Sequence, residues 1–168
     1  MSHDWRKIAK EHGPIVWRSV FRILRSHAES MDCFQDVMLE AFEKTGSKQI
    51  DNWAGYLRWL AVHRALDRFR SSQRRQQMVR TRPDMEHVYE AATESELEIE
   101  ELKDRLRSEL AVLPESQAEA FWLRFIEEMS YGEIAEQMGL DTNAVGVLIH
   151  RARPRVRQAL SDLQPKRS

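Results

Sequence analysis

Apolar residues recur at helical spacing along most of the chain, and this periodicity limits the possible folds more than any other feature. Only six glycines and five prolines occur in 168 residues, so there are few points at which a helix must stop. No stretch sustains the alternation of apolar and polar residues that is typical of a half-buried strand. These patterns predict an all-α protein.

Local signals indicate where the helices of the first half begin. Pro14 is typical of a first helical turn, so we expect a helix to open there after a shorter one near Trp5. Asp32 and Gln35 have the spacing of a capping box and predict the start of another helix. The turn residues of 45–52 indicate a loop before a long helix. The expected helices cover residues 14–24, 32–44 and 53–75.

Charge is distributed in three blocks, although the net charge is only −1. Residues 64–82 contain seven arginines and one acidic residue, residues 84–104 contain nine acidic residues and one lysine, and residues 151–168 contain six basic residues and one acidic residue. Two basic blocks suggest a polyanionic partner, although arginine-rich helix ends also occur as solvated faces. The acidic block either keeps a linker soluble or masks a basic surface in the free protein.

Weak periodicity and a proline separate two groups of helices. We expect a linker over residues 76–96, which joins a domain over residues 1–75 to a second domain over residues 97–168. In the second domain Pro114 is expected to open a helix after the break at Leu113. The expected fold is therefore all-α, with two small helical domains joined by an acidic linker.

The segment "SYGEIAEQMGLDT" (130–142) has the signals of a short helix, a tight turn and a second helix. Ser130 and Glu133 form a capping-box pattern, and Gly139 is suited to a C-cap. Asp141 or Thr142 is suited to cap the second helix. This order is typical of a helix-turn-helix unit, and an ordinary helical hairpin with a basic rim is the alternative.

Helical geometry divides the last helix into an inner and an outer face. The inner face is expected to contain Val145, Ile149, Ala152 and Val156. On the outer face Val147 can meet a thymine methyl group in the major groove, and the arginines after it are suited to phosphate contacts. Pro154 points outward and is expected to kink or end the helix. The outer face also includes Asn143, His150, Arg151 and Arg157.

These motifs resemble those of the extracytoplasmic-function sigma factors of bacterial RNA polymerase. "LPESQAEAFWLRFIEEMSYGEIAEQMGLDTNAVGVLIHRARPRVRQAL" (113–160) is similar to the family's region four, and "DCFQDVMLEAFEK" (32–44) with "NWAGYLRWLAVHRALDRFR" (52–70) is similar to region two. The resemblance implies that region two docks on the polymerase clamp and opens the minus-ten promoter element, while region four binds the minus-thirty-five element as duplex. It also implies a linker that threads through the polymerase and an anti-sigma protein that holds the factor inactive.

The resemblance and the outer face together give the residues expected at the upstream duplex. Gly146 and Leu148 stand where the family often has polar or basic residues, so DNA shape is expected to contribute to recognition. Gly146 either lets the backbone approach DNA closely or simply weakens the helix by about 1 kcal/mol. The expected duplex contacts are Thr142, Asn143, Ala144, Val147, His150, Arg151, Arg153 and Arg155.

One face of the helix over residues 32–44 is acidic around a leucine, which suits either protein docking or a solvated surface. Asp36 and Glu40 match acidic positions of the family's clamp-binding motif, whereas Leu39 stands where glutamine is usual. The opposite face is expected to be core and contains Phe34, Val37, Met38 and Ala41. The expected polymerase contacts are Asp36, Leu39, Glu40 and Glu43.

A stripe along the helix over residues 53–75 consists of Tyr56, Trp59, His63 and Arg70. Such a stripe suits single-stranded DNA because bases stack on rings and cations hold phosphates, although the rings suit a core equally well. In the family the preceding loop holds a flipped-out base, and that loop maps to residues 45–52. The residues expected to open the promoter are Ser47, Lys48, Asn52, Trp53, Tyr56, Trp59, His63, Arg64 and Arg70.

The sequence argues against several other classes of protein. It has no phosphate-binding glycine loop or nucleophile motif, and its six histidines lack ligand-like spacing, so no catalytic centre, metal, cofactor or small-molecule substrate is expected. The single Cys33 and the lack of a long apolar run predict a cytoplasmic protein without disulfides or membrane insertion. A stand-alone helix-turn-helix regulator, with residues 1–75 as a dimerisation or sensor domain, is the alternative to a sigma factor.

Overall fold

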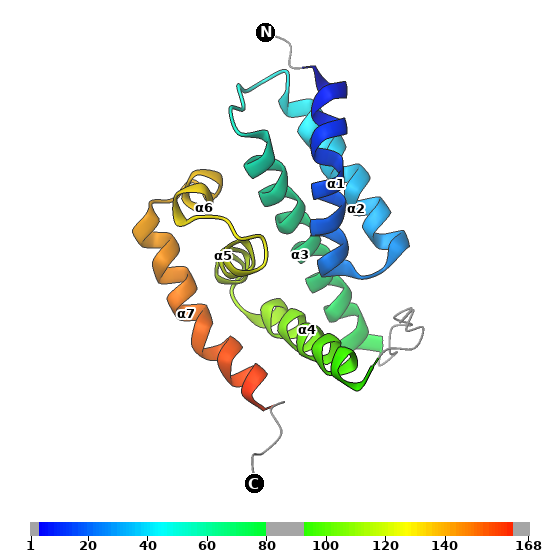
Figure 1. The fold of residues 1–168 in the computed structure, drawn as a ribbon, viewed down its shortest axis with the longest axis vertical. Helices are drawn as coiled ribbons and strands as arrows, with labels where there is room; N and C mark the ends of the chain where they lie inside the picture. The colour runs from blue at the N-terminus through cyan, green and yellow to red at the C-terminus, as the bar shows by residue number, and fades with distance from the viewer. Residues whose placement is uncertain (1–3, 80–92, 163–168) are drawn as a thin grey trace.

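A computed structural model of the chain describes residues 4–79 and 93–162, and within these ranges all regular structure is α-helical (Figure 1). The all-α expectation is confirmed. The helices are α1 (Trp5–Leu24), α2 (His27–Lys44), α3 (Trp53–Val79), α4 (Glu94–Val112), α5 (Glu115–Phe125), α6 (Tyr131–Met138) and α7 (Thr142–Ser161). None of the helices in these ranges combines the length and hydropathy that a membrane span requires.

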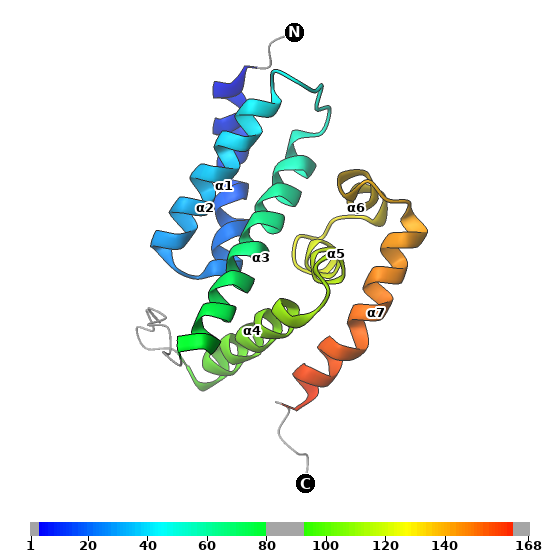
Figure 2. The same cartoon turned by 180° about the vertical axis from the view of Figure 1, so that it is seen from behind.

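The first three helices lie side by side as a bundle (Figures 1 and 2). Each turns an apolar face inward, and the core includes Val16, Val20 and Ile23 of α1, Val37 and Ala41 of α2, and Leu57 and Leu60 of α3. Full burial of one such side chain stabilises a fold by roughly 1.5–3 kcal/mol. The expected core positions of α2 are confirmed, although its Phe34 and Met38 are only half-buried. This core fixes which sides of α2 and α3 face outward.

The start of α1 differs from the expectation. The helix begins at Trp5, where the side chain of Asp4 accepts a hydrogen bond from the Lys7 amide (3.4 Å), and it continues through Pro14. Pro14 is exposed, and buried residues both before and after it hold α1 against the bundle. Tertiary packing therefore offsets the backbone hydrogen bond that the proline removes.

The start of α2 also differs from the expectation. It begins at His27, after Ser26 in an extended conformation, and the Ser26 hydroxyl accepts from the Glu29 amide (3.3 Å). Asp32 lies inside the helix and does not cap it. The serine caps earlier because the chain leaves α1 through Arg25, whose left-handed backbone (φ 59°) ends that helix and directs the chain into α2.

Cys33 lies in the core of the first bundle. Its side chain is fully buried, and burial raises the pKa of its thiol to about 11. Thiolate is therefore scarce at neutral pH, and Cys33 behaves as a small apolar core residue.

The helix-turn-helix signals of the second half are confirmed. Ser130 and Glu133 form the reciprocal capping box of α6, and Gly139 ends α6 with a left-handed backbone (φ 68°). Asp141 caps α7 by accepting from the Ala144 amide at 2.7 Å. The expected inner face of α7 is buried. α7 does not end at Pro154, which lies exposed within the helix.

The two groups of helices pack against each other. α5 lies between α3 and α7, and α4 crosses the end of α3 and contacts α7 (Figures 1 and 2). α3 extends to Val79 and α4 begins at Glu94 behind a Thr93 cap, so both ends of the expected linker over residues 76–96 are helical. The middle of that linker, residues 80–92, lies outside the described residues.

Candidate nucleic-acid interfaces

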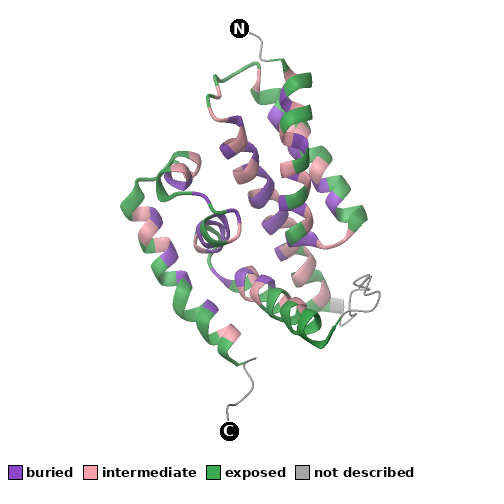
Figure 3. Ribbon diagram, in the orientation of Figure 1, coloured by how far each residue is buried: buried purple, intermediate pink, exposed green. Residues whose placement is uncertain are grey.

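The outer side of α7 is the first candidate interface. Burial of the opposite side turns the expected duplex contacts to solvent, and all eight are exposed except Ala144, which is half-buried (Figure 3). Val147 keeps 47% of its surface exposed, so its methyl groups are available to a thymine methyl group. The eight side chains are therefore distributed around the solvent-facing side of α7.

Two arginines on the flank of α7 contact neighbouring helices. The guanidinium of Arg153 lies over the Phe125 ring, 5.3 Å from its centroid, and Nε of Arg155 lies 3.5 Å from Oε1 of Glu109. These contacts limit where the two charges can lie. Cations beside a reading face suit phosphate contacts, which set the register of a helix on duplex DNA.

The second candidate interface is a pocket of about 460 Å³ beside the loop that precedes α3. Four residues expected to open the promoter line it, namely Lys48, Asn52, Tyr56 and Trp59. Asn52 also fixes the start of α3, because its Oδ1 accepts from the Gly55 amide at 3.0 Å. A pocket between aromatic and polar side chains can hold one unstacked base. Its opposite wall includes Glu136 and Gln137 of α6.

Five of the nine residues expected to open the promoter do not line the pocket: His63 and Arg64 lie further along α3, and three others lie elsewhere. Trp53 is buried, with its ring centroid 6.2 Å from that of Trp5 in an edge-on arrangement. Arg70 is also buried and donates to the Leu110 carbonyl of α4 at 3.4 Å. Ser47 is exposed in the loop but does not line the pocket. The sequence pattern of α3 could not reveal the coverage of Arg70, because α4 belongs to a distant segment.

Trp59 and His63 share one carboxylate from the second half of the chain. Trp59 Nε1 donates to Oε1 of Glu119, and His63 Nδ1 lies 2.8 Å from Oε2 of Glu119. The two rings stack with their centroids 5.1 Å apart, and only 6% of the Glu119 side chain is exposed. The hydrogen bond to Glu119 raises the pKa of His63 above its ordinary value, against the opposing effect of burial.

His63 is also the centre of a group with metal-ligand chemistry. One ligand atom each from His63, Glu115 and Glu119 lies within 4.8 Å of the others. Sequence spacing could not indicate this group, because its members come from α3 and α5. The hydrogen bond between His63 and Glu119 accounts for their approach without an ion.

The acidic face of α2 carries exposed apolar side chains and two ion pairs. Leu39 is 62% exposed, and Phe42 is exposed one turn further along. Both oxygens of Glu40 accept from Arg64 of α3 at 2.9 Å, which lowers the pKa of Glu40, and Asp36 pairs with Arg68. Glu43 is exposed. Arg64 is therefore already paired with Glu40, one of the expected polymerase contacts.

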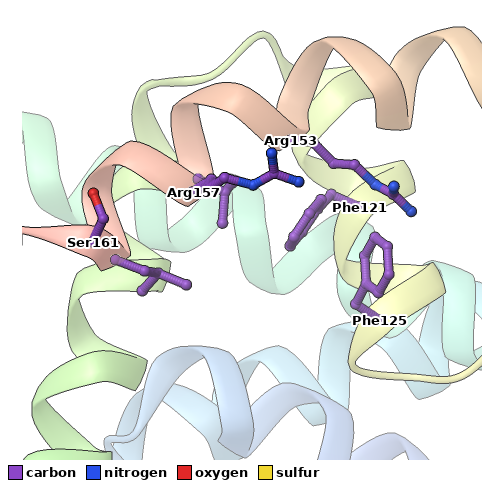
Figure 4. Close-up of a pocket in the computed structure, with 7 residues that line it drawn as sticks. Phe121, Phe125, Arg153, Arg157 and Ser161 are labelled. Carbon is purple, nitrogen blue, oxygen red and sulfur yellow. The ribbon is translucent and has the colours of Figure 1, made fainter. Parts of the chain in front are cut away.

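A groove between α5 and the end of α7 was not expected from the sequence. It has a volume of about 360 Å³ and is lined by Phe121, Phe125, Arg153, Val156, Arg157, Leu160 and Ser161. Figure 4 shows the two phenylalanine rings of α5 beside the arginine side chains of α7. The helical pattern placed Val156 on the inner face of α7, but it could not show that a groove lies between α7 and α5.

The matches to known proteins agree with this arrangement of helices. The sigma-70 region 2 family matches residues 8–75, and the sigma-70 region 4 family matches residues 103–156. The chain therefore belongs to the sigma-70 family of sigma factors, and within that family to the extracytoplasmic-function type. The resemblance found in the sequence is confirmed.

Two individual proteins are similar over most of the chain. ECF RNA polymerase sigma factor SigE of Mycolicibacterium smegmatis is 25% identical over 159 residues, which are 94% of this chain and 62% of SigE. This chain thus spans less than two thirds of the length of SigE. The sigma factor RpoE of Bartonella quintana, solved in complex with the anti-sigma factor NepR, has the same fold, with a TM-score of 0.62 and 20% identity over 94% of this chain and 97% of RpoE.

Proposed function

We propose that this protein directs bacterial RNA polymerase to promoters, with residues 1–75 as the unit that binds polymerase and the minus-ten element. Residues 97–168 bind the minus-thirty-five element, and residues 76–96 connect the two units. The pocket beside the loop before α3 supports this proposal most strongly. A regulator that only binds duplex DNA has no use for a base-sized pocket on α3 that includes no residue of its reading helix α7.

Upstream recognition is assigned to α7. Asn143, Val147, His150 and Arg151 read base edges, while Arg153 and Arg155 contact phosphates. Thr142 and Ala144, at the start of the helix, approach the backbone of the duplex. The exposure of these residues and the fixed positions of the two flanking arginines support this division of roles.

Strand capture is assigned to the loop and first turns of α3. Lys48, Asn52, Tyr56 and Trp59 hold a flipped base, with Ser47 at the loop surface and His63 one turn further along α3. Stacking contributes about 1–3 kcal/mol per base, which is comparable with the cost of unstacking that base from duplex DNA. Trp53 supports Tyr56 from the core, with ring centroids 6.0 Å apart. Arg64 and Arg70 act mainly through their protein contacts.

Polymerase docking is assigned to the exposed side of α2. Leu39 supplies an apolar centre, and Asp36, Glu40 and Glu43 supply acidic groups around it. The partners are the bacterial core polymerase, promoter DNA and an anti-sigma protein, the last by analogy with the RpoE–NepR complex. The protein acts in the cytoplasm, without a cofactor and without catalysing a reaction itself.

Run-off transcription with purified core polymerase tests the proposal, with templates obtained by sequencing the promoter DNA that the assembled complex retains. We expect initiation from defined start sites only when the protein is present. No initiation, together with tight duplex binding by the protein alone at physiological salt, would establish the stand-alone regulator instead. Leu39→Ser should weaken assembly with polymerase, whereas Leu97→Ser, at an exposed leucine of α4, should not.

A further inference from the structure

In the free protein, Glu119 of α5 is bound to Trp59 and His63 of α3. We propose that region 4 masks the strand-capture surface of region 2, with Glu119 occupying the polar edges of Trp59 and His63, so that the two units must separate before a promoter strand binds. This inference rests on the proposed function of the pocket and the stripe on α3. It goes beyond that function because it assigns an inhibitory role to residues that do not contact DNA.

The Glu119 carboxylate is chemically a substitute for nucleic acid. Its two oxygens are bound to Trp59 and His63, the ring N–H groups that would otherwise meet phosphate or base acceptors. The side chain is almost completely buried, so a strand cannot reach these donors while α5 stays in place. One set of donors cannot serve both acceptors, and binding is therefore competitive.

A second carboxylate, that of Glu127, also connects the two units, through contacts with α1. Oε2 of Glu127, just after α5, accepts from the Ser19 hydroxyl at 3.0 Å, and Oε1 lies 3.6 Å from Arg22. Only 3% of the Glu127 side chain is exposed. The next residue, Glu128, has a left-handed backbone (φ 57°), a conformation that costs a non-glycine residue energy and persists only where surrounding contacts impose it.

Part of the acidic segment after the linker makes a third contact. Glu100 of α4 accepts from Arg25 at 2.9 Å, whereas its neighbours Glu98 and Glu101 are exposed. Of the described acidic side chains of residues 84–104, Glu100 thus pairs with a basic residue of the first bundle, as expected if the acidic block masks a basic surface. Most of the masking comes from the carboxylates that α5 and the turn after it bring to α1 and α3.

Region 4 also forms one wall of the pocket. A methyl group built on Gly55 of α3 would lie 3.2 Å from Nε2 of Gln137, so α6 lies directly against the start of α3. A DNA strand that continues along α3 past Gly55 must displace α6. The apparent affinity for a single strand is therefore the intrinsic affinity reduced by the fraction of molecules in which the units have separated.

The outer face of α7 is not masked in the same arrangement. Val147, His150 and Arg151 are exposed while Glu119 is buried against α3. The closed protein thus keeps its duplex-reading surface accessible and withholds only its strand-capture surface. Separation should change single-strand binding much more than duplex binding.

The test uses the full-length protein with dyes on Gln35→Cys in α2 and Gln158→Cys in α7, both at exposed positions. Cys33 can remain, because its burial and raised pKa protect it from labelling. Energy transfer between the dyes measures separation of the units. A short fluorescein-labelled oligonucleotide of mixed sequence, single-stranded or duplex, measures binding in the unlabelled protein. Glu119→Gln is the test variant, and Glu101→Gln makes the same charge change on an exposed side of α4.

We expect Glu119→Gln to lower energy transfer and to strengthen single-strand binding by about tenfold, since one charge-assisted contact is lost from the closed state only. Duplex binding should change less than about twofold by the same reasoning, and Glu101→Gln should match wild type. Wild-type energy transfer and single-strand affinity in a folded Glu119→Gln variant would overturn the inference. If that variant does not fold, Ser19→Ala, which removes a donor to Glu127, must lower energy transfer or the inference fails.

The experiment separates this inference from the proposed function. A wild-type protein that fails to support run-off transcription, beside a Glu119→Gln variant that opens, would reject the sigma-factor assignment and keep the contact. A wild-type protein that initiates transcription, beside a Glu119→Gln variant that stays closed, would reject the masking role and keep the sigma-factor assignment.

Discussion

The two surfaces to which we assign DNA binding differ in how far the rest of the chain covers them. On α7, the face assigned to duplex DNA is exposed, and the core contacts of the helix are all on its other side. On α3, the stripe assigned to a single strand is half-buried, and its polar edges are bound to Glu119. In the part of the chain that the structure describes, the surface assigned to duplex DNA is accessible while the surface assigned to a single strand is covered.

The largest expected effect separates the two roles of Trp59. Trp59→Ala removes a stacking ring and should reduce run-off transcription by roughly ten- to a hundredfold, the equivalent of about 1–3 kcal/mol. Trp59→Phe replaces the indole with a smaller ring that lacks the N–H bound to Glu119 but can still stack. It should therefore lower energy transfer between the units while retaining most transcription. Equal activity of both variants would show that the ring does not stack on a base.

The next effect concerns α7. Arg151→Ala should weaken binding to the upstream promoter element by about tenfold or more, since a base contact of arginine contributes about 1–3 kcal/mol. Assembly with core polymerase, measured by co-elution, should be unchanged because Arg151 lies far from the acidic face of α2. Arg105→Ala, at an exposed arginine of α4, is the control for charge. Loss of assembly with normal folding would mean that the two surfaces are wrongly assigned.

A smaller effect comes from pH. Glu119 and Glu115 of α5, Glu40 of α2, and Asp67 and Arg64 of α3 surround His63, and the bond to Glu119 raises its pKa above 6.5 in the closed state. The bond between protonated His63 and Glu119 therefore stabilises the closed state fully below pH 6.5, and this stabilisation is lost as pH rises through the raised pKa of His63. Energy transfer between the units should therefore fall by an observable fraction from pH 6 to pH 9. His63→Gln should flatten this dependence, and an unchanged profile would exclude His63 as its source.

The smallest effect tests Gly146 of α7. A methyl group built there would lie 3.9 Å from the Tyr131 ring, an ordinary contact distance, so alanine fits the folded protein. Gly146→Ala should raise the free energy of unfolding by about 0.5–1 kcal/mol, measured by urea denaturation. Unchanged duplex affinity would mean that the glycine only weakens the helix. Reduced affinity would mean that the DNA backbone needs the space that the glycine leaves.

Sequence signals succeeded where structure is local. Ser130, Glu133, Gly139 and Asp141 define their caps through bonds within four residues, so the helix-turn-helix unit was predictable almost to the residue. The prediction that a helix begins at Pro14 was wrong, because apolar contacts between helices outweigh the local preference of proline for a first turn.

The candidate sites also differ in whether local sequence determines them. The outer face of α7 follows from helical periodicity alone, and its exposure agrees with the sequence. Trp59 and Glu119 lie 60 residues apart, and no spacing rule connects them. The burial of Arg70 under α4 and that of Trp53 beside Trp5 likewise depend on how helices from different segments meet.

Pro154, inside α7, interrupts the backbone hydrogen bonds of this helix. Because proline has no amide hydrogen, the carbonyl oxygen of His150 loses its usual partner one turn later. The turns of α7 assigned to base reading and the turns that pack on α4 are consequently joined where one backbone hydrogen bond is missing. Bending α7 at this point therefore breaks one backbone hydrogen bond fewer than bending it elsewhere along the helix would.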